Sequence, residues 1–316
     1  MSPLRNIRIS ATGSYVPSRI VRSEELASNL QTDVNWIYEN LGIVERRVAG
    51  DNELSSDLGY RAGLDALKNS NIDKNDLDLI IVATATPDRK APSTACIIQH
   101  KMGLTNQCPA FDINAVCSGF LYAMTLGGQL IQGGMYRNIL VIGVDTFSKI
   151  TDWTRRDCVF FGDGAGAVLL QESSYPDALF SSLLYANGNG MDCFTVYPDE
   201  QFFNMNAKAV YETGTRVLPE AIRQILDKNN LEISDVSVII PHQPSLRVLK
   251  RTAELLGIPI SKIEMNLDLY ANTASATVPL LLDQVNKAGK IKPGDIVVFA
   301  AVGSGWTWGA AVYKWH

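Results

Sequence analysis

The chain has 316 residues, of which 46% are hydrophobic and 19% are charged, and it carries a net charge of −5. A chain of this length can bury a large core and is long enough for two domain-sized units. The acidic balance excludes a basic nucleic-acid-binding surface, and no apolar run approaches the roughly 18 residues that cross a bilayer.

Cysteine usage points to a reducing compartment. The amino-terminal segment lacks the apolar core of a secretory signal. The cysteines are odd in number and have no C-x-x-C spacing: Cys96, Cys108, Cys117, Cys158 and Cys193. This pattern predicts reduced thiols in a cytoplasmic protein rather than disulfides or structural zinc.

Two stretches of the chain follow the same order of predicted elements. Residues 62–81 have the pattern of a helix, a turn and a buried strand, and residues 221–240 repeat it. Further along, the apolar runs 138–143 and 295–300 each predict a strand. Order and spacing both match, which favours an internal duplication over two unrelated domains with coinciding patterns.

In each repeat a glycine-rich segment follows, at residues 162–166 and 303–309, and is predicted to be a turn before a closing strand. Helices alternating with fully apolar strands predict mixed sheets covered by helices on both faces. We therefore predict an α/β fold of five layers, αβαβα, from two duplicated halves at residues 1–172 and 173–316.

Three residues suited to thioester chemistry follow predicted strands. Cys117, His242 and Asn272 come after residues 111–113, 238–240 and 265–267, respectively. The carboxyl ends of strands are where α/β folds build their sites. Since the cysteine belongs to one half and the other two residues to the second, the site is expected where the two sheets meet.

The expected chemistry follows from the residue types. A free thiol has a pKa of about 8.5, and only its thiolate is a strong nucleophile. Cys117 precedes a predicted buried helix, whose N-terminal N–H groups and dipole favour the anion. His242 and Asn272 can donate hydrogen bonds to a thioester oxygen that becomes an enolate, and a neutral imidazole suffices for this. A buried structural histidine is the alternative for His242.

These motifs resemble the β-ketoacyl-acyl-carrier-protein synthase III family, condensing enzymes of the thiolase superfamily. The resemblance is specific because the matching segments keep their order along nearly the whole chain. They are Gly13–Pro17, Trp36–Ile37, Gly42–Arg46, Pro92–Cys96, Phe111–Tyr122, Phe161–Ala167, His242–Gln243, Asn272–Thr273 and Thr307–Gly309.

The resemblance implies that Cys117 accepts an acyl group from a coenzyme A thioester. A malonyl group, typically on acyl carrier protein, then loses CO₂ while His242 and Asn272 stabilise the enolate. Attack on the acyl-cysteine gives a β-ketoacyl product, as in the initiation of fatty acid synthesis. The backbone N–H groups of Cys117 and Ser304 would form a second oxyanion hole.

The resemblance also implies binding residues and partners. Substrate and coenzyme A contacts are expected from Thr32, Trp36, Met205, Ser245 and either Arg155 or Arg156. Carrier-protein docking is expected on the basic helical face of Arg247, Lys250 and Arg251, for which a merely solvated face is the alternative. A homodimer is implied in which loop 84–92, with Ala91, completes the partner's acyl pocket. No metal, nicotinamide, flavin or phosphate-loop motif occurs, so no cofactor is expected, and neither a membrane nor nucleic acid is an expected partner.

The chain departs from the family pattern around the substrates. Asn40 stands where an arginine is usual, Ser245 where an asparagine is usual, and Glu212 replaces a docking lysine. Ala91 replaces a bulky residue, often phenylalanine, which predicts a deeper or differently shaped acyl pocket. These changes leave open a specialised enzyme of secondary metabolism that transfers an unusual acyl group to a different acceptor.

Two other classes fit less well. Papain-like proteases also have Cys, His and Asn in this order, but their cysteine lies near the mature N-terminus within Cys-Gly-Ser-Cys-Trp. A catalytically silent subunit commonly lacks the nucleophile, whereas Cys117 is present.

Overall fold

The structure, a computed structural model, describes residues 5–316. Its first sheet has five strands in the order β1 (Asn6–Tyr15), β7 (Asp163–Ser173), β6 (Asn138–Thr146), β4 (Leu79–Ala83) and β5 (Ala110–Ile113). The β1–β7 and β7–β6 pairs are antiparallel, and the β6–β4 and β4–β5 pairs are parallel. Every residue of β4 is buried, as its continuous apolar sequence predicts for a strand covered on both faces.

The second sheet is also mixed. Its order is β11 (Val236–Pro241), β12 (Ile296–Gly303), β13 (Gly305–Lys314) and β8 (Phe180–Gly190). The β11–β12 pair is parallel, and the β12–β13 and β13–β8 pairs are antiparallel. Two short antiparallel ribbons complete the strands: β2 (Arg19–Arg22) with β3 (Glu45–Val48), and β9 (Phe194–Thr195) with β10 (Asn204–Met205).

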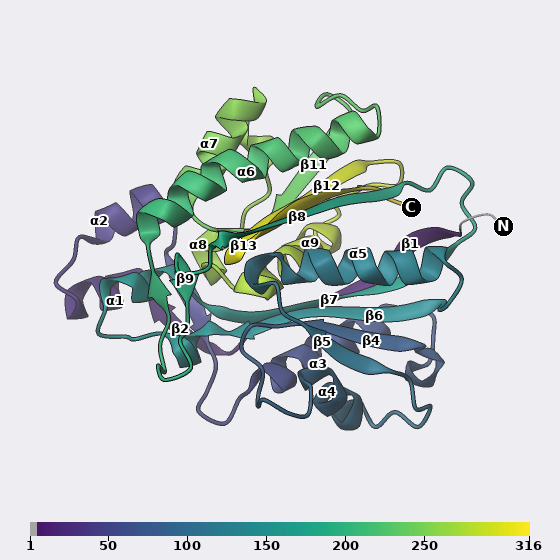
Figure 1. The fold of residues 1–316 in the computed structure, drawn as a ribbon, viewed down its shortest axis with the longest axis horizontal. Coiled ribbons are helices and arrows are strands. Elements are labelled where there is room, and N and C mark those ends of the chain that lie inside the picture. The colour runs from purple at the N-terminus through teal and green to yellow at the C-terminus, as the bar shows by residue number, and fades with distance from the viewer. Residues whose placement is uncertain (1–4) are drawn as a thin grey trace.

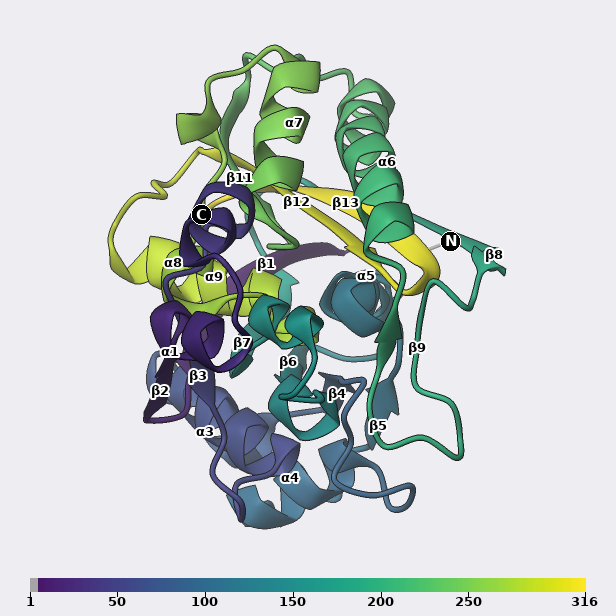
Figure 2. The same ribbon diagram turned by 90° about the vertical axis from the view of Figure 1, so that its left-hand side faces the viewer.

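Helices cover both faces of both sheets (Figure 1). Figure 2 shows the layers edge-on: α6 (Ala207–Lys228) and α7 (Leu246–Leu256), the second sheet, α5 (Gly119–Gln132) and α9 (Thr277–Lys287), the first sheet, then α3 (Ser55–Lys68) and α4 (Thr94–Met102). Three shorter helices lie at one side: α1 (Ser23–Asn29), α2 (Val34–Trp36) and α8 (Leu267–Tyr270). The predicted five-layer αβαβα fold is confirmed.

The central helical layer is buried between the two sheets. Phe120 and Met124 of α5 pack with Leu281 of α9 between Ile81 of the first sheet and Phe299 of the second, and all five side chains are buried. Full burial of such side chains stabilises the fold by roughly 1.5–3 kcal/mol each. This layer therefore fixes the two sheets against each other, and with them the ends of the strands that carry the site.

The helices and strands occur in the same order in the two parts of the chain. The order α3, β4, α4, α5, β6, β7 in the first part of the chain is matched by α6, β11, α7, α9, β12, β13 in the second. This parallel order supports the division at residues 172 and 173, which stays a prediction.

Two local predictions were wrong. The first glycine-rich segment is strand rather than turn, because β7 begins at Asp163, whereas the second contains the predicted turn at Ser304, between the antiparallel strands β12 and β13. In β7 the glycines serve close packing: a Cβ on Gly166 would lie 2.3 Å from the backbone nitrogen of Leu280 in α9. The strand predicted at residues 265–267 is also absent, because pairing there is reduced to a single bridge between Ile239 and Ile263 before α8 begins.

Candidate active site

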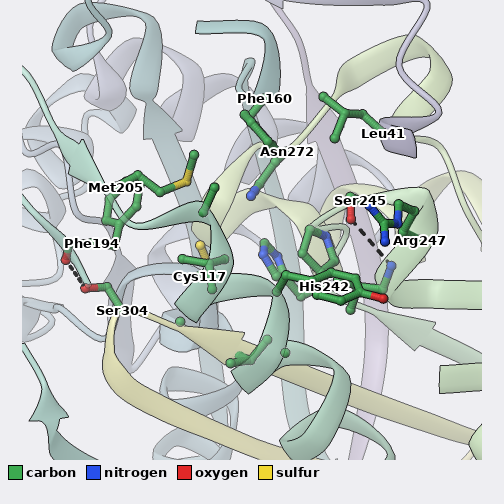
Figure 3. Close-up of a pocket in the computed structure, with 18 of the residues that line it drawn as sticks. Leu41, Cys117, Phe160, Phe194, Met205, His242, Ser245, Arg247, Asn272 and Ser304 are labelled. Carbon is green, nitrogen blue, oxygen red and sulfur yellow. Dashed lines mark hydrogen bonds between the residues drawn. The ribbon is translucent and has the colours of Figure 1, made fainter. Parts of the chain in front are cut away.

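A cavity of about 310 Å³ opens where the ends of the two sheets meet. Its lining includes Cys117, His242, Asn272 and Ser304 together. In Figure 3, Cys117 lies beside His242 and below Asn272, with Ser304 and Phe194 on one side. The structure thus brings the three predicted functional side chains into one cavity, from segments far apart in sequence.

Cys117 occupies a short 3₁₀ turn, Val116–Ser118, between β5 and α5. Val116 has a φ of 46°, a left-handed conformation that is unfavourable for a β-branched residue. Hydrogen bonds hold the turn: the Ser275 hydroxyl donates to the Val116 carbonyl at 2.8 Å, and the Ser118 hydroxyl donates to Ala115 O at 2.9 Å. Such strain persists only where the surroundings determine it, and here it places the sulfur in the cavity at the start of α5.

The Cys117 thiol is less acidic than its helix position indicates. Burial raises its pKa, and the carboxylate of Asp145 raises it further. Its own backbone N–H and the side-chain amide of Asn272 act in the opposite direction. The expected stabilisation of the thiolate by the helix N-terminus is therefore outweighed, and the resting sulfur is a protonated thiol.

Asp145, at the end of β6, is a buried residue that the sequence analysis missed. One carboxylate oxygen accepts hydrogen bonds from Ala85 N at 2.8 Å, Thr86 N at 3.0 Å and the Thr86 hydroxyl at 2.8 Å. The other accepts from Ser275 N at 2.9 Å. Asp145 thus joins the first sheet to the segment before α9, and through Ser275 to the turn of Cys117.

His242 follows β11 directly, and its side chain is 2% exposed. Its backbone N–H donates to Ala300 O at 2.8 Å. Burial lowers the pKa of the imidazole to about 3, so the ring is neutral at physiological pH. Nδ1 has no hydrogen-bond partner within residues 5–316. The next residue, Gln243, donates to Pro241 O and Glu264 O, both at 3.1 Å, which fixes the loop.

Asn272 is held through its backbone and one side-chain atom. Its N–H donates to Phe160 O, and its carbonyl accepts from Gly162 N, both at 3.0 Å. The side-chain oxygen accepts from Ala274 N at 2.9 Å. This contact leaves the amide nitrogen free to donate, and Figure 3 shows that nitrogen pointing into the cavity.

The end of β12 lies against the turn of Cys117. A Cβ added to Gly303 would be 2.8 Å from Ala115 O and 3.0 Å from the backbone nitrogens of Cys117 and Ser118. Ser304 follows at once, and its hydroxyl donates to Phe194 O. The backbones of Cys117 and Ser304 are therefore neighbours, as a shared oxyanion hole requires.

The predicted binding residues divide into two groups. Trp36, Met205, Ser245 and Arg247 line the cavity. The others do not line it: Thr32, Ala91, Arg155, Arg156, Lys250 and Arg251. Asn40 also lines the cavity, and its side-chain amide donates to Trp36 O at 2.9 Å.

The two neighbouring arginines make different contacts. The Arg156 guanidinium lies 4.5 Å from the ring centroid of Trp36. Arg155 instead pairs with Asp157 and donates to Phe203 O at 2.9 Å. Arg156 is the arginine placed beside the tryptophan.

An aromatic cluster that was not predicted from the sequence also borders the cavity, and we call it the phenylalanine wall: Phe147, Phe161, Phe194 and Phe203. Cys117 packs against it. Its members come from four separate segments, so no local sequence pattern reveals it. Within residues 5–316, no group of three metal-binding side chains occurs, and no helix is both long and apolar enough to cross a membrane.

The αβαβα fold and a cavity in which a cysteine from the first half of the chain meets an imidazole and an amide from the second half define the class, the thiolase-fold condensing enzymes. Comparison with known proteins then identifies the family. Residues 111–188 match the family model "3-Oxoacyl-[acyl-carrier-protein (ACP)] synthase III", and residues 226–315 match the model of its C-terminal part.

Individual relatives extend the match to the whole chain. β-Ketoacyl-[acyl-carrier-protein] synthase III of Clostridium acetobutylicum is 38% identical over 326 residues, with 99% of each chain covered. The crystal structure of 3-oxoacyl-[acyl-carrier-protein] synthase III from Aquifex aeolicus has a TM-score of 0.94 at 35% identity, covering 98% of this chain and 100% of that one. The priming β-ketosynthase of the R1128 polyketide pathway has a TM-score of 0.92 at 27% identity, covering 100% and 98%.

The chain belongs to the 3-oxoacyl-[acyl-carrier-protein] synthase III family. It is a condensing acyltransferase, as the sequence predicted.

Proposed function

We propose that this protein joins an acyl group from an acyl-coenzyme A to a malonyl group on acyl carrier protein, with loss of CO₂, in the initiation of fatty acid synthesis. The observation that carries the proposal is the single cavity shared by Cys117, His242 and Asn272. The family membership of the chain and the names of its relatives agree with it.

In the first step, the Cys117 sulfur attacks the thioester carbonyl and loses its proton. Coenzyme A leaves as a thiolate and takes up a proton. The negative charge that develops on the carbonyl oxygen is stabilised by the backbone N–H groups of Cys117 and Ser304. Removing one such donor typically costs about 100- to 1,000-fold in kcat. The N-terminus of α5 favours the sulfur anion as it forms.

In the second step, the malonyl thioester loses CO₂, and the electron pair of the broken C–C bond moves into an enolate. His242 and Asn272 donate hydrogen bonds to the enolate oxygen. Burial lowers the pKa of the imidazole to about 3, so the ring is neutral and donates through its single N–H. The enolate carbon then bonds to the acyl carbonyl carbon, and the Cys117 sulfur leaves as a thiolate.

Substrate binding at the cavity mouth rests on further contacts. Trp36 and Arg156 form a flat cationic pair suited to the adenine of coenzyme A. Arg247, Lys250 and Arg251 are exposed on α7 and present positive charge to an acidic carrier protein. Arg251 also bonds Glu254 at 3.0 Å, which reduces the charge that it offers. Thr32, Met205 and Ser245 complete the proposed contacts, and the chemistry requires neither a metal nor an organic cofactor.

We further propose a homodimer in the cytoplasm. The short strand β5 lies at one edge of the first sheet, where a second copy can continue the ladder. Ala91 is exposed in the loop that would reach the partner's cavity. All five cysteines are free thiols in the described part of the chain, in keeping with a reducing compartment.

The second candidate is a specialised enzyme with an unusual donor or acceptor. Asn40 favours it, because this residue lines the cavity but brings no charge for a phosphate, and its amide is bonded to Trp36 O. Likeness to a priming β-ketosynthase of polyketide synthesis agrees with such a role.

The test is a reconstituted reaction with acetyl-coenzyme A and malonyl-acyl carrier protein, analysed by mass spectrometry of the carrier. The proposal predicts an acetoacetyl-carrier product that Cys117→Ala abolishes and that Asn272→Ala reduces by about two orders of magnitude. Turnover with malonyl-coenzyme A but not with the carrier supports the specialised enzyme. An unchanged rate for Cys117→Ala would contradict both candidates.

A further inference from the structure

Arg46 of β3 is a buried positive charge that bonds no acidic side chain within residues 5–316. Its side chain is 0% exposed, and burial lowers its pKa only to about 10, so the guanidinium is charged at neutral pH. Nη1 donates to Ser23 Oγ at 3.2 Å and to Val21 O at 3.4 Å, and Nη2 donates to Val159 O at 2.8 Å. Nε has no hydrogen-bond partner in the described chain.

Packing alone does not explain a guanidinium at this position. Removing a charge from water is costly when no opposite charge compensates for it, and an apolar side chain of similar volume often stabilises a core as well or better. The hydrogen bonds of Arg46 are what an apolar side chain could not supply. The shortest of them, to Val159 O, joins β3 to a segment that lies beside the cavity.

Val159 belongs to a segment that holds Asn272. It lies in the 3₁₀ turn Arg156–Phe160, and the last carbonyls of such a turn lack partners inside it and favour a positive charge nearby. The carbonyl of Phe160 accepts from Asn272 N, and Gly162 N donates to Asn272 O, both at 3.0 Å. Figure 3 shows Phe160 beside Asn272 at the cavity. The guanidinium thus fixes the segment to which the backbone of Asn272 is bonded.

The residue after β3 holds the other end of this segment. Ala49 N donates to Asp163 Oδ2 at 2.7 Å. Between the two bonds the packing is close: a Cβ added to Gly162 would lie 3.0 Å from the Arg46 Cβ and 2.4 Å from Tyr270 O. Closely packed interiors transmit displacements, so a shift of this segment would reach the amide that the proposed reaction uses.

We infer that Arg46 is a positioning residue for the second step of the reaction, because it fixes residues 159–162 and through them the side-chain amide of Asn272. The inference rests on the proposed function, in which that amide donates to the enolate oxygen. Arg46 does not line the cavity, so it acts without touching substrate. Acylation of Cys117 uses the backbone N–H groups of Cys117 and Ser304, and it should depend on Arg46 much less.

The expected effect follows from the cost of misplacing a hydrogen-bond donor. Losing one preorganised donor typically lowers a rate by about 100- to 1,000-fold, and a misplacement of about 1 Å lowers it by about 100-fold. Lysine at position 46 keeps the charge but lacks the planar fork that bonds Ser23 and Val159 together. Methionine fills similar space with neither charge nor donor.

The experiment measures the two half-reactions separately in the full-length protein, by rapid quenching and intact-mass spectrometry. Acetylation is followed at saturating acetyl-coenzyme A, so that a shift of Arg156 does not limit it. The acetyl-enzyme, freed of excess donor, is then discharged by saturating malonyl-acyl carrier protein. Arg46→Lys and Arg46→Met are each tested alone and combined with Asn272→Ala, and thermal unfolding verifies that each variant is folded. Arg8→Lys is the matched control, because the Arg8 guanidinium also bonds a neutral oxygen, that of Gln171 at 3.0 Å in β7.

We expect both Arg46 variants to be acetylated within about threefold of the wild-type rate but discharged about ten- to hundredfold more slowly. Arg8→Lys should stay within about threefold of wild type in both steps. If Arg46 acts through Asn272, the same substitutions should slow discharge by no more than about threefold further in the Asn272→Ala protein.

The possible failures are distinguishable. Equal slowing of both half-reactions, or the same fold-loss of discharge with and without the Asn272 amide, would show a general structural role and overturn the inference. Discharge at the wild-type rate in either folded Arg46 variant would overturn it as well, and the proposed function would stand. If malonyl-acyl carrier protein does not discharge the wild-type acetyl-enzyme, the proposed function itself fails.

Discussion

Replacing Gly303 by alanine probes how the end of β12 shapes the proposed oxyanion hole. The added methyl group would lie 2.8 Å from Ala115 O and 3.0 Å from Cys117 N, where ordinary contacts are 3.4–4 Å. The atoms that the methyl group meets belong to the backbone of the Cys117 turn, which the Ser275 hydroxyl holds through Val116 O. The steric clash can therefore be relieved only if this turn and β12 move apart. Overpacking of this kind costs about 1–3 kcal/mol of stability. Because the displaced N–H is a proposed oxyanion donor, we expect kcat to fall about 100- to 1,000-fold.

The assay compares condensation rates and thermal unfolding of Gly303→Ala with those of Gly188→Ala. Gly188 is also a strand glycine, but no atom of the described residues lies within 4 Å of a Cβ added there. We expect the control to keep wild-type kcat, and both proteins to keep a cooperative unfolding transition. A folded Gly303→Ala enzyme with more than about a tenth of wild-type kcat would refute the role given to this backbone.

Three further substitutions test the positioning of the site. Ser275→Ala removes the hydrogen bond to Val116 O and should lower the free energy of unfolding by about 1 kcal/mol and slow acylation of Cys117 several-fold; wild-type labelling kinetics would contradict this. His242→Gln should change how stability depends on pH. In the unfolded wild-type chain the imidazole binds a proton below its usual pKa of 6.5, whereas in the folded protein its pKa is about 3. Between these two pKa values, the contribution of His242 to the free energy of unfolding therefore falls by about 1.4 kcal/mol for each pH unit of acidification. Urea unfolding at several pH values should show the wild type losing stability relative to the variant on acidification, and a constant difference would show that the histidine is not buried neutral. Arg156→Ala should raise the KM for acyl-coenzyme A about tenfold with little change in kcat, measured by steady-state kinetics, and an unchanged KM would remove the arginine from the coenzyme site.

The parts of the site that follow local sequence patterns were predictable. Cys117 stands between a short strand and a buried helix, and His242 follows the β-branched run 238–240 and Pro241, so their places at strand ends could be inferred. The absence of the strand expected before Asn272 could not be inferred from local sequence. Whether that segment pairs depends on its contact with β11, some twenty residues earlier, and this contact is limited to one bridge.

Long-range contacts explain what the sequence did not reveal. Asp145 ends an apolar strand, and only the fold shows that its carboxylate bridges to Ser275. The members of the phenylalanine wall are unremarkable in their own segments and meet only after both sheets have formed. The effect of burial on the Cys117 pKa likewise depends on the finished fold rather than on the helix that follows it.

The most direct test of the two-step reaction isolates the acyl-enzyme. Wild-type protein is incubated with acetyl-coenzyme A alone, freed of excess donor, weighed by mass spectrometry, and then mixed with malonyl-acyl carrier protein. We predict a mass gain of one acetyl group that maps to Cys117, followed by return to the original mass as acetoacetyl-acyl carrier protein forms. A product that forms with no acylation of Cys117, or an acetyl group on Cys117 that the malonyl substrate does not discharge, would contradict it.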